Sequence, residues 1–243
     1  VVKCALSGLK SGSKDFNIDA KAILCCYRMI TDEENWETVK LAEKYYTQGV
    51  VGIDLAGDEE NYTTEKFIKF LKRAHEANIP ITCHIGETPK GKGMKYVFDI
   101  PIQRVGHGVY LESSSEGLVE KVKEMQLPIE TCLTSNVQTH VVDSYETHPF
   151  KKFYDLGLKV TLNTDDRSVS NIDLTHEYKV AIEKYQLNFD DIIKFIHNSI
   201  DSAFLPKVEK TNLRRTIEKE LQVAVGTNKK HILADGVRAG EHL

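Results

Sequence analysis

Short apolar segments recur along the chain at nearly regular intervals. Each has the length of a β-strand and is mostly apolar, which is typical of parallel strands covered by helices on both faces. The six predicted strands cover residues 23–28, 50–55, 80–84, 102–106, 128–132 and 158–163. Their first residues lie 22 to 30 positions apart, so each interval has room for one helix and two loops.

Helical periodicity fills the intervals between these strands. Apolar residues spaced three and four positions apart predict three amphipathic helices. Their stripes are Trp36, Val39, Ala42 and Tyr46; Phe67, Phe70, Leu71 and Ala74; and Leu118, Val119, Val122 and Met125. After the last strand the pattern is helical only, over about residues 173–185, 189–204 and 211–223. Residues 134–149 have no clear period and are predicted to form a loop, and the tail from Gly226 gives no reliable signal.

Six strand–helix units in series indicate an α/β fold of one of two kinds. The kinds are a doubly wound open sheet and an incomplete (β/α)8 TIM barrel. No G-x-G-x-x-G motif follows a strand, and the stretch Gly91-Lys92-Gly93 lacks the pattern of a phosphate-binding loop. We expect residues 1–243 to form a single domain.

Composition narrows the classes of partner. The chain has 243 residues and a net charge of -4, which disfavours nucleic acid, since that partner requires a basic surface. No apolar run approaches the ~18 residues of a membrane span, so we expect no membrane partner. The five cysteines form no C-x-x-C pair and predict reduced thiols in a cytoplasmic protein. A leader before Val1 would not be visible, and the sequence leaves the oligomeric state open.

Acidic and histidine residues gather at the carboxyl ends of four predicted strands. In a barrel of parallel strands these ends meet at one face, where active sites lie. The residues are Asp54 in the second strand, His84 and Glu87 at the end of the third, His107 after the fourth, and Asp165 and Asp166 after the sixth. Random placement of polar residues would not favour one end of each strand, so we expect a functional site there.

Each of these residues also has a structural interpretation. His84 alone fits a hydrogen-bonded structural histidine, and Glu87 alone fits a carboxylate at a helix N-terminus. Asp165 and Asp166 fit an N-cap pair for the following helix. Asp54 lies between Ile53 and Leu55 and fits a buried structural acid. Their occurrence together on four strands favours the functional interpretation.

The residue types favour metal-assisted hydrolysis. Neutral imidazole and carboxylate are ligands for a divalent ion such as Zn²⁺ that keeps one position open for water. Water bound in this way has a pKa near ~7 and attacks at neutral pH. A second carboxylate would transfer protons and a second histidine would orient the water. The predicted reaction is hydrolytic attack on an electron-poor carbon.

Five motifs over about residues 20–205 resemble, in order and spacing, those of the adenosine deaminases. They are Gly52-Ile53-Asp54-Leu55-Ala56-Gly57-Asp58-Glu59, His84-Ile85-Gly86-Glu87, Arg104-Val105-Gly106-His107-Gly108, Leu133-Thr134-Ser135-Asn136 and Asn163-Thr164-Asp165-Asp166. The resemblance implies a zinc-dependent (β/α)8 barrel that converts adenosine to inosine and ammonia in purine salvage. This chain would supply about six of its eight strands and the C-terminal helices.

The resemblance also implies roles in catalysis. His84 and Asp165 would be ligands of one Zn²⁺ per chain, and Asp165 would thereby belong to the catalytic residues. Glu87 would protonate the purine nitrogen N1 as water adds to C6. His107 would orient and polarise the metal-bound water. The chemistry of the family accordingly coincides with the chemistry that the residue types favour.

Two residues are implied to bind the substrate, a purine nucleoside. Asp166 would form a hydrogen bond with it, and the backbone N–H of Gly57 would bind purine N3. Two departures from the family affect specificity: Ile85 stands where Ala is common, and Arg167 stands where Pro is common. The alternatives are therefore a deaminase of adenine, methylthioadenosine or AMP, and a non-catalytic relative that binds a nucleoside.

A third departure concerns the metal. The family's first strand supplies a His-x-His pair to zinc, whereas no two of the nine histidines in this chain are spaced i, i+2. Six strands also cannot close an eight-stranded barrel. We expect the chain to be a C-terminal portion of a longer protein whose N-terminal strands carry the remaining ligands.

Overall fold

A computed structural model of the chain describes residues 1–89 and 93–238. Within these residues a strand lies at each of the six predicted positions, and the strands pair in parallel. They are β1 (Ala22–Tyr27), β2 (Val50–Ala56), β3 (Thr82–Ile85), β4 (Arg104–His107), β5 (Ile129–Thr131) and β6 (Val160–Leu162). The sequence therefore predicted every one of these strands to within a few residues of its ends.

The strands pair in the order in which they occur along the chain. β1 pairs with β2, and β3, β4, β5 and β6 form a four-stranded sheet in that order. A bridge between Ile53 and Ile81 joins β2 to β3, and the Ile53 N–H donates to the Pro80 carbonyl at 2.9 Å. A doubly wound sheet would reverse its strand order, and this series does not. The winding is that of a barrel, and the described residues leave it open between β6 and β1.

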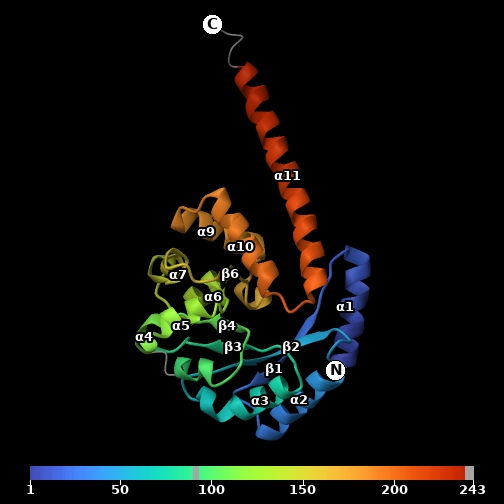
Figure 1. Cartoon of the computed structure of the whole chain (residues 1–243), viewed down its shortest axis with the longest axis vertical. Coiled ribbons are helices and arrows are strands. Elements are labelled where there is room, and N and C mark those ends of the chain that lie inside the picture. The colour runs from blue at the N-terminus through green and yellow to red at the C-terminus, as the bar shows by residue number, and fades with distance from the viewer. Residues whose placement is uncertain (90–92, 239–243) are drawn as a thin grey trace. The chain divides into compact units, whose positions relative to one another are not determined.

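Helices follow the strands throughout (Figure 1). They are α1 (Val2–Phe16), α2 (Asp32–Tyr45), α3 (Ile68–Glu76), α4 (Leu111–Ser114), α5 (Leu118–Glu124), α6 (Leu133–Gln138), α7 (Phe150–Asp155), α8 (Arg167–Ser170), α9 (Leu174–Tyr185), α10 (Phe189–Ser202) and α11 (Lys207–Arg238). Short 3-10 helices are η1 (Thr64–Phe67), η3 (Met94–Phe98) and η4 (Tyr145–Thr147). None of the described helices combines the length and apolar composition needed to cross a membrane.

The chain divides into two compact units. The first is Val1–Phe204 and contains all six strands, and the second is Leu205–Leu243, of which the structure describes residues up to 238. Every residue of the predicted site lies in the first unit. The expectation of a single domain over 1–243 stays a prediction.

The predicted apolar stripes form much of the core of the first unit. α2 and α3 pack against each other, where the Trp36 ring meets the edge of Phe70 at a centroid distance of 4.7 Å, and Phe70 and Leu71 are fully buried. The third predicted stripe, which runs from Leu118 to Met125, is only partly buried. Leu118 is buried, but α5 ends at Glu124 and leaves Met125 exposed.

The prediction of a loop over residues 134–149 is wrong. This segment contains most of α6 and all of η4. α6 has no apolar stripe from which a helix could be predicted, because it buries the polar residues Thr134, Ser135 and Asn136 alongside Leu133. Buried polar side chains require hydrogen-bond partners, and these three find theirs in the candidate active site and its surroundings.

The five cysteines are free thiols, and Cys26, Cys83 and Cys132 are buried. Burial raises the pKa of the Cys26 thiol to about 12. A thiol of this kind stays protonated and behaves as a small apolar side chain.

Candidate active site

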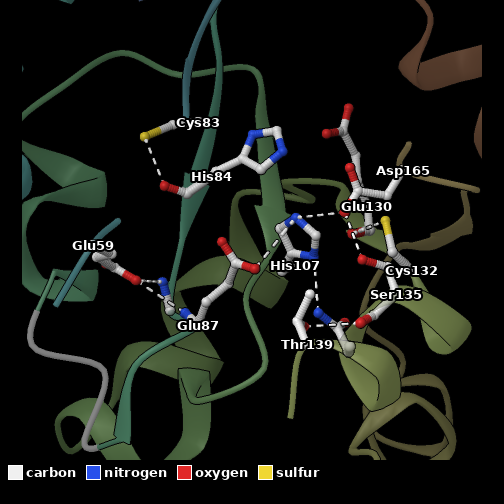
Figure 2. Close-up of polar contacts among 12 residues, drawn as sticks. Glu59, Cys83, His84, Glu87, His107, Glu130, Cys132, Ser135, Thr139 and Asp165 are labelled. Atoms are coloured by element: carbon white, nitrogen blue, oxygen red, sulfur yellow. Dashed lines mark hydrogen bonds and ion pairs between the residues drawn. The ribbon is translucent and has the colours of Figure 1, made fainter. Parts of the chain in front are cut away.

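Three of the predicted residues converge at the carboxyl ends of the strands. His84 lies in β3, His107 is the last residue of β4, and Asp165 follows β6. One potential ligand atom of each lies within 4.8 Å of those of the other two (Figure 2). The parallel strand order brings these residues together from distant parts of the sequence, as the barrel prediction required.

His84 is held from behind by Asp54. Its Nδ1 lies 2.9 Å from Asp54 Oδ2, which leaves Nε2 as the ring atom available to a ligand. Burial alone would raise the pKa of Asp54, but the neighbouring His84 imidazole outweighs this effect and lowers it. Burial likewise opposes the charge on His84, but Asp54 dominates and raises the pKa of His84 to about 9. A carboxylate behind a histidine is the usual support of a metal ligand.

Asp165 is oriented by α6. The Ser135 hydroxyl donates to Asp165 Oδ2 at 2.7 Å, and the Thr139 hydroxyl donates to the Ser135 carbonyl at 2.8 Å. The backbone of Asp165 is left-handed, with φ of +57°. That conformation turns the chain at the end of the strand, and the helix supplies the contact that fixes the carboxylate.

His107 occupies the centre of the site. It is 2% exposed, and its Nε2 lies 3.7 Å from Glu87 Oε1 and 3.9 Å from Asp165 Oδ2, so that it stands between the two carboxylates (Figure 2). Its other ring nitrogen, Nδ1, lies 3.1 Å from Asn136 Nδ2. The φ of His107 is +62°, a left-handed conformation that is uncommon outside glycine and concentrates at functional sites.

The loop that carries Glu87 is anchored by Glu59. The buried Glu59 carboxylate accepts hydrogen bonds from the backbone N–H groups of Gly86 and Glu87, at 2.9 and 3.0 Å (Figure 2). Burial raises the pKa of Glu59. Glu59 is the last residue of the motif that begins at Gly52, but no role was predicted for it from the sequence. Its position two residues after Gly57 was the signal that could have indicated one.

The two predicted substrate-binding residues lie at the same strand ends but outside the cluster of His84, His107 and Asp165. Asp166 is the N-cap of α8, and its Oδ1 accepts from the N–H groups of Ser168 and Val169, both at 3.0 Å. The N-cap interpretation therefore holds for Asp166. Gly57 follows β2 with φ of +100°, where a side chain would be strained and would meet the Tyr27 ring.

The residues present fit a zinc ion. Imidazole nitrogen and carboxylate oxygen are ligand types of Zn²⁺. His84 has the carboxylate support expected behind a zinc ligand, and Asp165 has a fixed orientation. A cavity of about 330 Å³ borders His84, His107 and Asp165 and extends between the strands past Arg104 and Glu130. An ion at the cluster would therefore remain accessible from this cavity.

The family model of adenosine deaminase matches residues 1–220. The chain belongs to the adenosine deaminase family. An adenosine deaminase from Clostridium acetobutylicum is 37% identical over 219 residues, which are 90% of this chain and 65% of that relative. The chain therefore spans just under two thirds of the length of this curated family member.

Solved structures of the family's fold are similar as well. The apo N6-methyl-AMP deaminase from Arabidopsis thaliana matches with a TM-score of 0.75 and 31% identity, over 82% of this chain and 58% of that protein. A zinc-bound amidohydrolase from Burkholderia ambifaria matches with a TM-score of 0.83 and 23% identity, over 91% of this chain and 62% of that protein. These similarities confirm the prediction of an incomplete (β/α)8 barrel.

The anchoring of the Glu87 loop yields a prediction about stability. Glu59→Ala leaves two backbone N–H groups without an acceptor, which should lower the free energy of unfolding by about 2 kcal/mol or more. Glu59→Gln keeps an acceptor oxygen and should cost about half as much or less. Urea denaturation measures both, with the exposed Glu60→Ala as control, expected within about 0.5 kcal/mol of the parent protein. Equal losses in the Ala and Gln variants would contradict the anchoring role.

Proposed function

We propose that this chain contributes to the zinc-dependent hydrolytic deamination of adenosine to inosine and ammonia. The observation that carries the proposal is the convergence of His84, His107 and Asp165 within 4.8 Å, with the Glu87 carboxylate 3.7 Å from His107 Nε2. Two imidazoles, a ligand carboxylate and a separate proton donor are the groups that this hydrolysis needs. Membership of the adenosine deaminase family supports the same reaction.

His84 and Asp165 are the residues that we assign to the metal. When bound, zinc would supply a Lewis acid that lowers the pKa of water and so provides a nucleophile at neutral pH. Asp54 would support His84 through Nδ1, and Ser135 would hold Asp165 through its hydroxyl. These contacts would keep both ligands in place while the substrate binds and leaves.

Glu87 and His107 are the residues that we assign to proton transfer and orientation. Water adds to C6 of the purine while Glu87 donates its proton to N1, which neutralises the negative charge that builds up on the ring. His107 directs the attacking water with its Nε2. Of the two protons of the water, one would restore the Glu87 carboxyl group and the other would pass to the C6 amino group. The C6–N bond would then break, ammonia would leave, and a C6 carbonyl would remain beside the protonated N1.

Asp166 and Gly57 are the residues that we assign to purine binding. With Asp166 Oδ1 accepting from the first turn of α8, Oδ2 is the atom we assign to the substrate. Gly57 would present its backbone N–H to N3. Its φ of +100° lets the chain turn at the end of β2 without a side chain.

A 5′-nucleotide such as AMP is the second candidate substrate. Arg167 directly follows Asp166 and, with Ser168 and His176, lines a cavity of about 640 Å³. An arginine there would attract a phosphate group, and the chain is 31% identical to an N6-methyl-AMP deaminase.

If adenosine is the substrate, kcat/KM should favour adenosine over AMP by more than about tenfold, which is about 1.4 kcal/mol. A preference for AMP that Arg167→Ser abolishes would establish the second candidate.

A further prediction concerns the metal. The intact protein should contain about one Zn²⁺ per chain, measured by elemental analysis. His84→Ala should weaken zinc binding by at least about tenfold, because it removes a ligand imidazole. His75→Ala, which removes an exposed histidine on α3, should leave zinc binding unchanged. An active intact protein without metal would refute the zinc assignment.

Glu87→Gln separates catalysis from folding. An amide donates a hydrogen bond but transfers no proton, so kcat should fall by roughly 10²–10⁴-fold while zinc and substrate still bind. A merely structural carboxylate predicts instead a stability change of about 1 kcal/mol or less and near-normal turnover. Steady-state kinetics and a thermal melt of the zinc-loaded intact protein distinguish the two. Near-normal kcat with zinc bound would remove Glu87 from the mechanism.

A further inference from the structure

A line of buried hydrogen bonds leads from the backbone of α7 to His107. The Phe150 N–H donates to His148 Nδ1 at 3.1 Å. His148 Nε2 lies 3.1 Å from Asn136 Oδ1, and Asn136 Nδ2 lies 3.1 Å from His107 Nδ1. Phe150 and Asn136 are fully buried, His107 is 2% exposed and His148 is 4% exposed. Water therefore does not replace these contacts, and each group depends on the partner that the fold gives it.

The first link fixes the tautomer of His148. A backbone N–H only donates, so His148 Nδ1 accepts and carries no proton. A neutral His148 then holds its proton on Nε2. Burial, together with the nearby His107, lowers the pKa of His148 to about 3, so the ring is neutral under ordinary conditions.

The second link fixes the orientation of the Asn136 amide. His148 Nε2–H needs an acceptor, and the only acceptor on the Asn136 side chain is Oδ1. The amide nitrogen therefore points toward His107. A neutral amide nitrogen only donates, so His107 Nδ1 accepts, and the proton of its neutral ring lies on Nε2.

The fixed tautomer places a hydrogen on the His107 nitrogen that faces the centre of the site. His107 Nε2 is the atom that lies 3.7 Å from Glu87 Oε1 and 3.9 Å from Asp165 Oδ2. A protonated Nε2 has no lone pair for a metal ion but has a hydrogen to donate. The distances alone would allow His107 to be a third metal ligand beside His84 and Asp165. The hydrogen bond at Nδ1 excludes this role, because it leaves the proton on Nε2.

We propose that Asn136 and His148 are positioning residues that hold His107 in its Nε2–H tautomer, so that His107 donates a hydrogen bond into the site and does not ligate the metal. The benefit to turnover rests on the proposed function. The tautomer itself is a property of this chain, with or without metal and substrate. These hydrogen bonds connect the segment between η4 and α7 to His107, although that segment contributes no residue to the cluster of His84, His107 and Asp165.

The tautomer is measured directly by NMR. In protein with ¹⁵N-labelled histidine rings, long-range ¹H–¹⁵N correlations distinguish Nε2–H from Nδ1–H, and His107→Gln assigns the His107 signals. The parent protein should show Nε2–H at His107. Asn136→Asp replaces the donor by a carboxylate that only accepts, so His107 should change to Nδ1–H. An Nδ1–H tautomer in the parent protein, or an unchanged tautomer in a folded Asn136→Asp protein, would overturn the proposal.

Variants of His148 test the more distant link and do not depend on Asn136→Asp folding. His148→Leu removes the donor that fixes the amide, so His107 should show a mixture of tautomers. His148→Gln keeps an N–H donor and should preserve Nε2–H. Tyr145→Phe is the matched control: it removes a hydroxyl from η4 that contacts Thr134 and not His107, and it should change nothing at His107. A single tautomer in the folded Leu variant would refute the role of His148.

Kinetics of the zinc-loaded intact protein then test the consequence for catalysis. His148→Leu should lower kcat about tenfold or more with little change in KM, as loss of a residue that supports an active-site group typically does. His148→Gln should recover most of this loss, and Tyr145→Phe should match the parent protein. His107→Ala should keep the zinc affinity of the parent protein, and a large loss of zinc would overturn the donor role. Expected tautomers without any deamination would instead refute the proposed function and leave the positioning intact.

Discussion

Pairing of each parallel strand with the next along the chain is the constraint on which the site depends. Since all six strands run in one direction and keep their order, their carboxyl ends lie along a single rim. His84, His107 and Asp165 each lie at or just beyond such an end. The same pairing brings β5 beside β4 and β6, so α6, which follows β5, lies next to both His107 and Asp165. A reversal of strand order would separate the helix from the residues that it orients.

Much of this arrangement could be predicted from the sequence, because the signals were local. A strand buried on both faces appears as a short apolar run, and polar residues at its end need no further information to be placed on the rim. His84, Glu87, His107 and Asp165 were found in this way, and the structure brings them together. Their chemical roles remain proposals.

The supporting residues could not be predicted, because their partners are distant in the sequence. α6 buries polar side chains, so a search for apolar periodicity passes over it. The role of Asn136 follows from its contacts with His107 and His148, which are distant in the sequence. The role of Glu59 likewise follows from its hydrogen bond with the backbone of the loop after β3. A hydrogen bond leaves no periodic trace in a sequence. Asp166 shows the converse, since an N-cap is a local contact and was among the interpretations that the sequence offered.

The left-handed backbone of His107 and Asp165 has a consequence for engineering. Residues with a side chain adopt this conformation at a cost of about 1 kcal/mol or more, and glycine adopts it freely. Glycine at Asp165, whose side chain is partly exposed, would relax the chain and remove the carboxylate at the same time. Glycine at the buried His107 would also leave a cavity and an unpaired Asn136 amide, which cost more than the relief of backbone strain. A stability–activity trade-off is therefore built into the ends of the strands. A screen that selects for thermal tolerance alone would therefore enrich glycine at Asp165, and not at His107, and would yield a more stable protein that lacks one of the two proposed metal ligands.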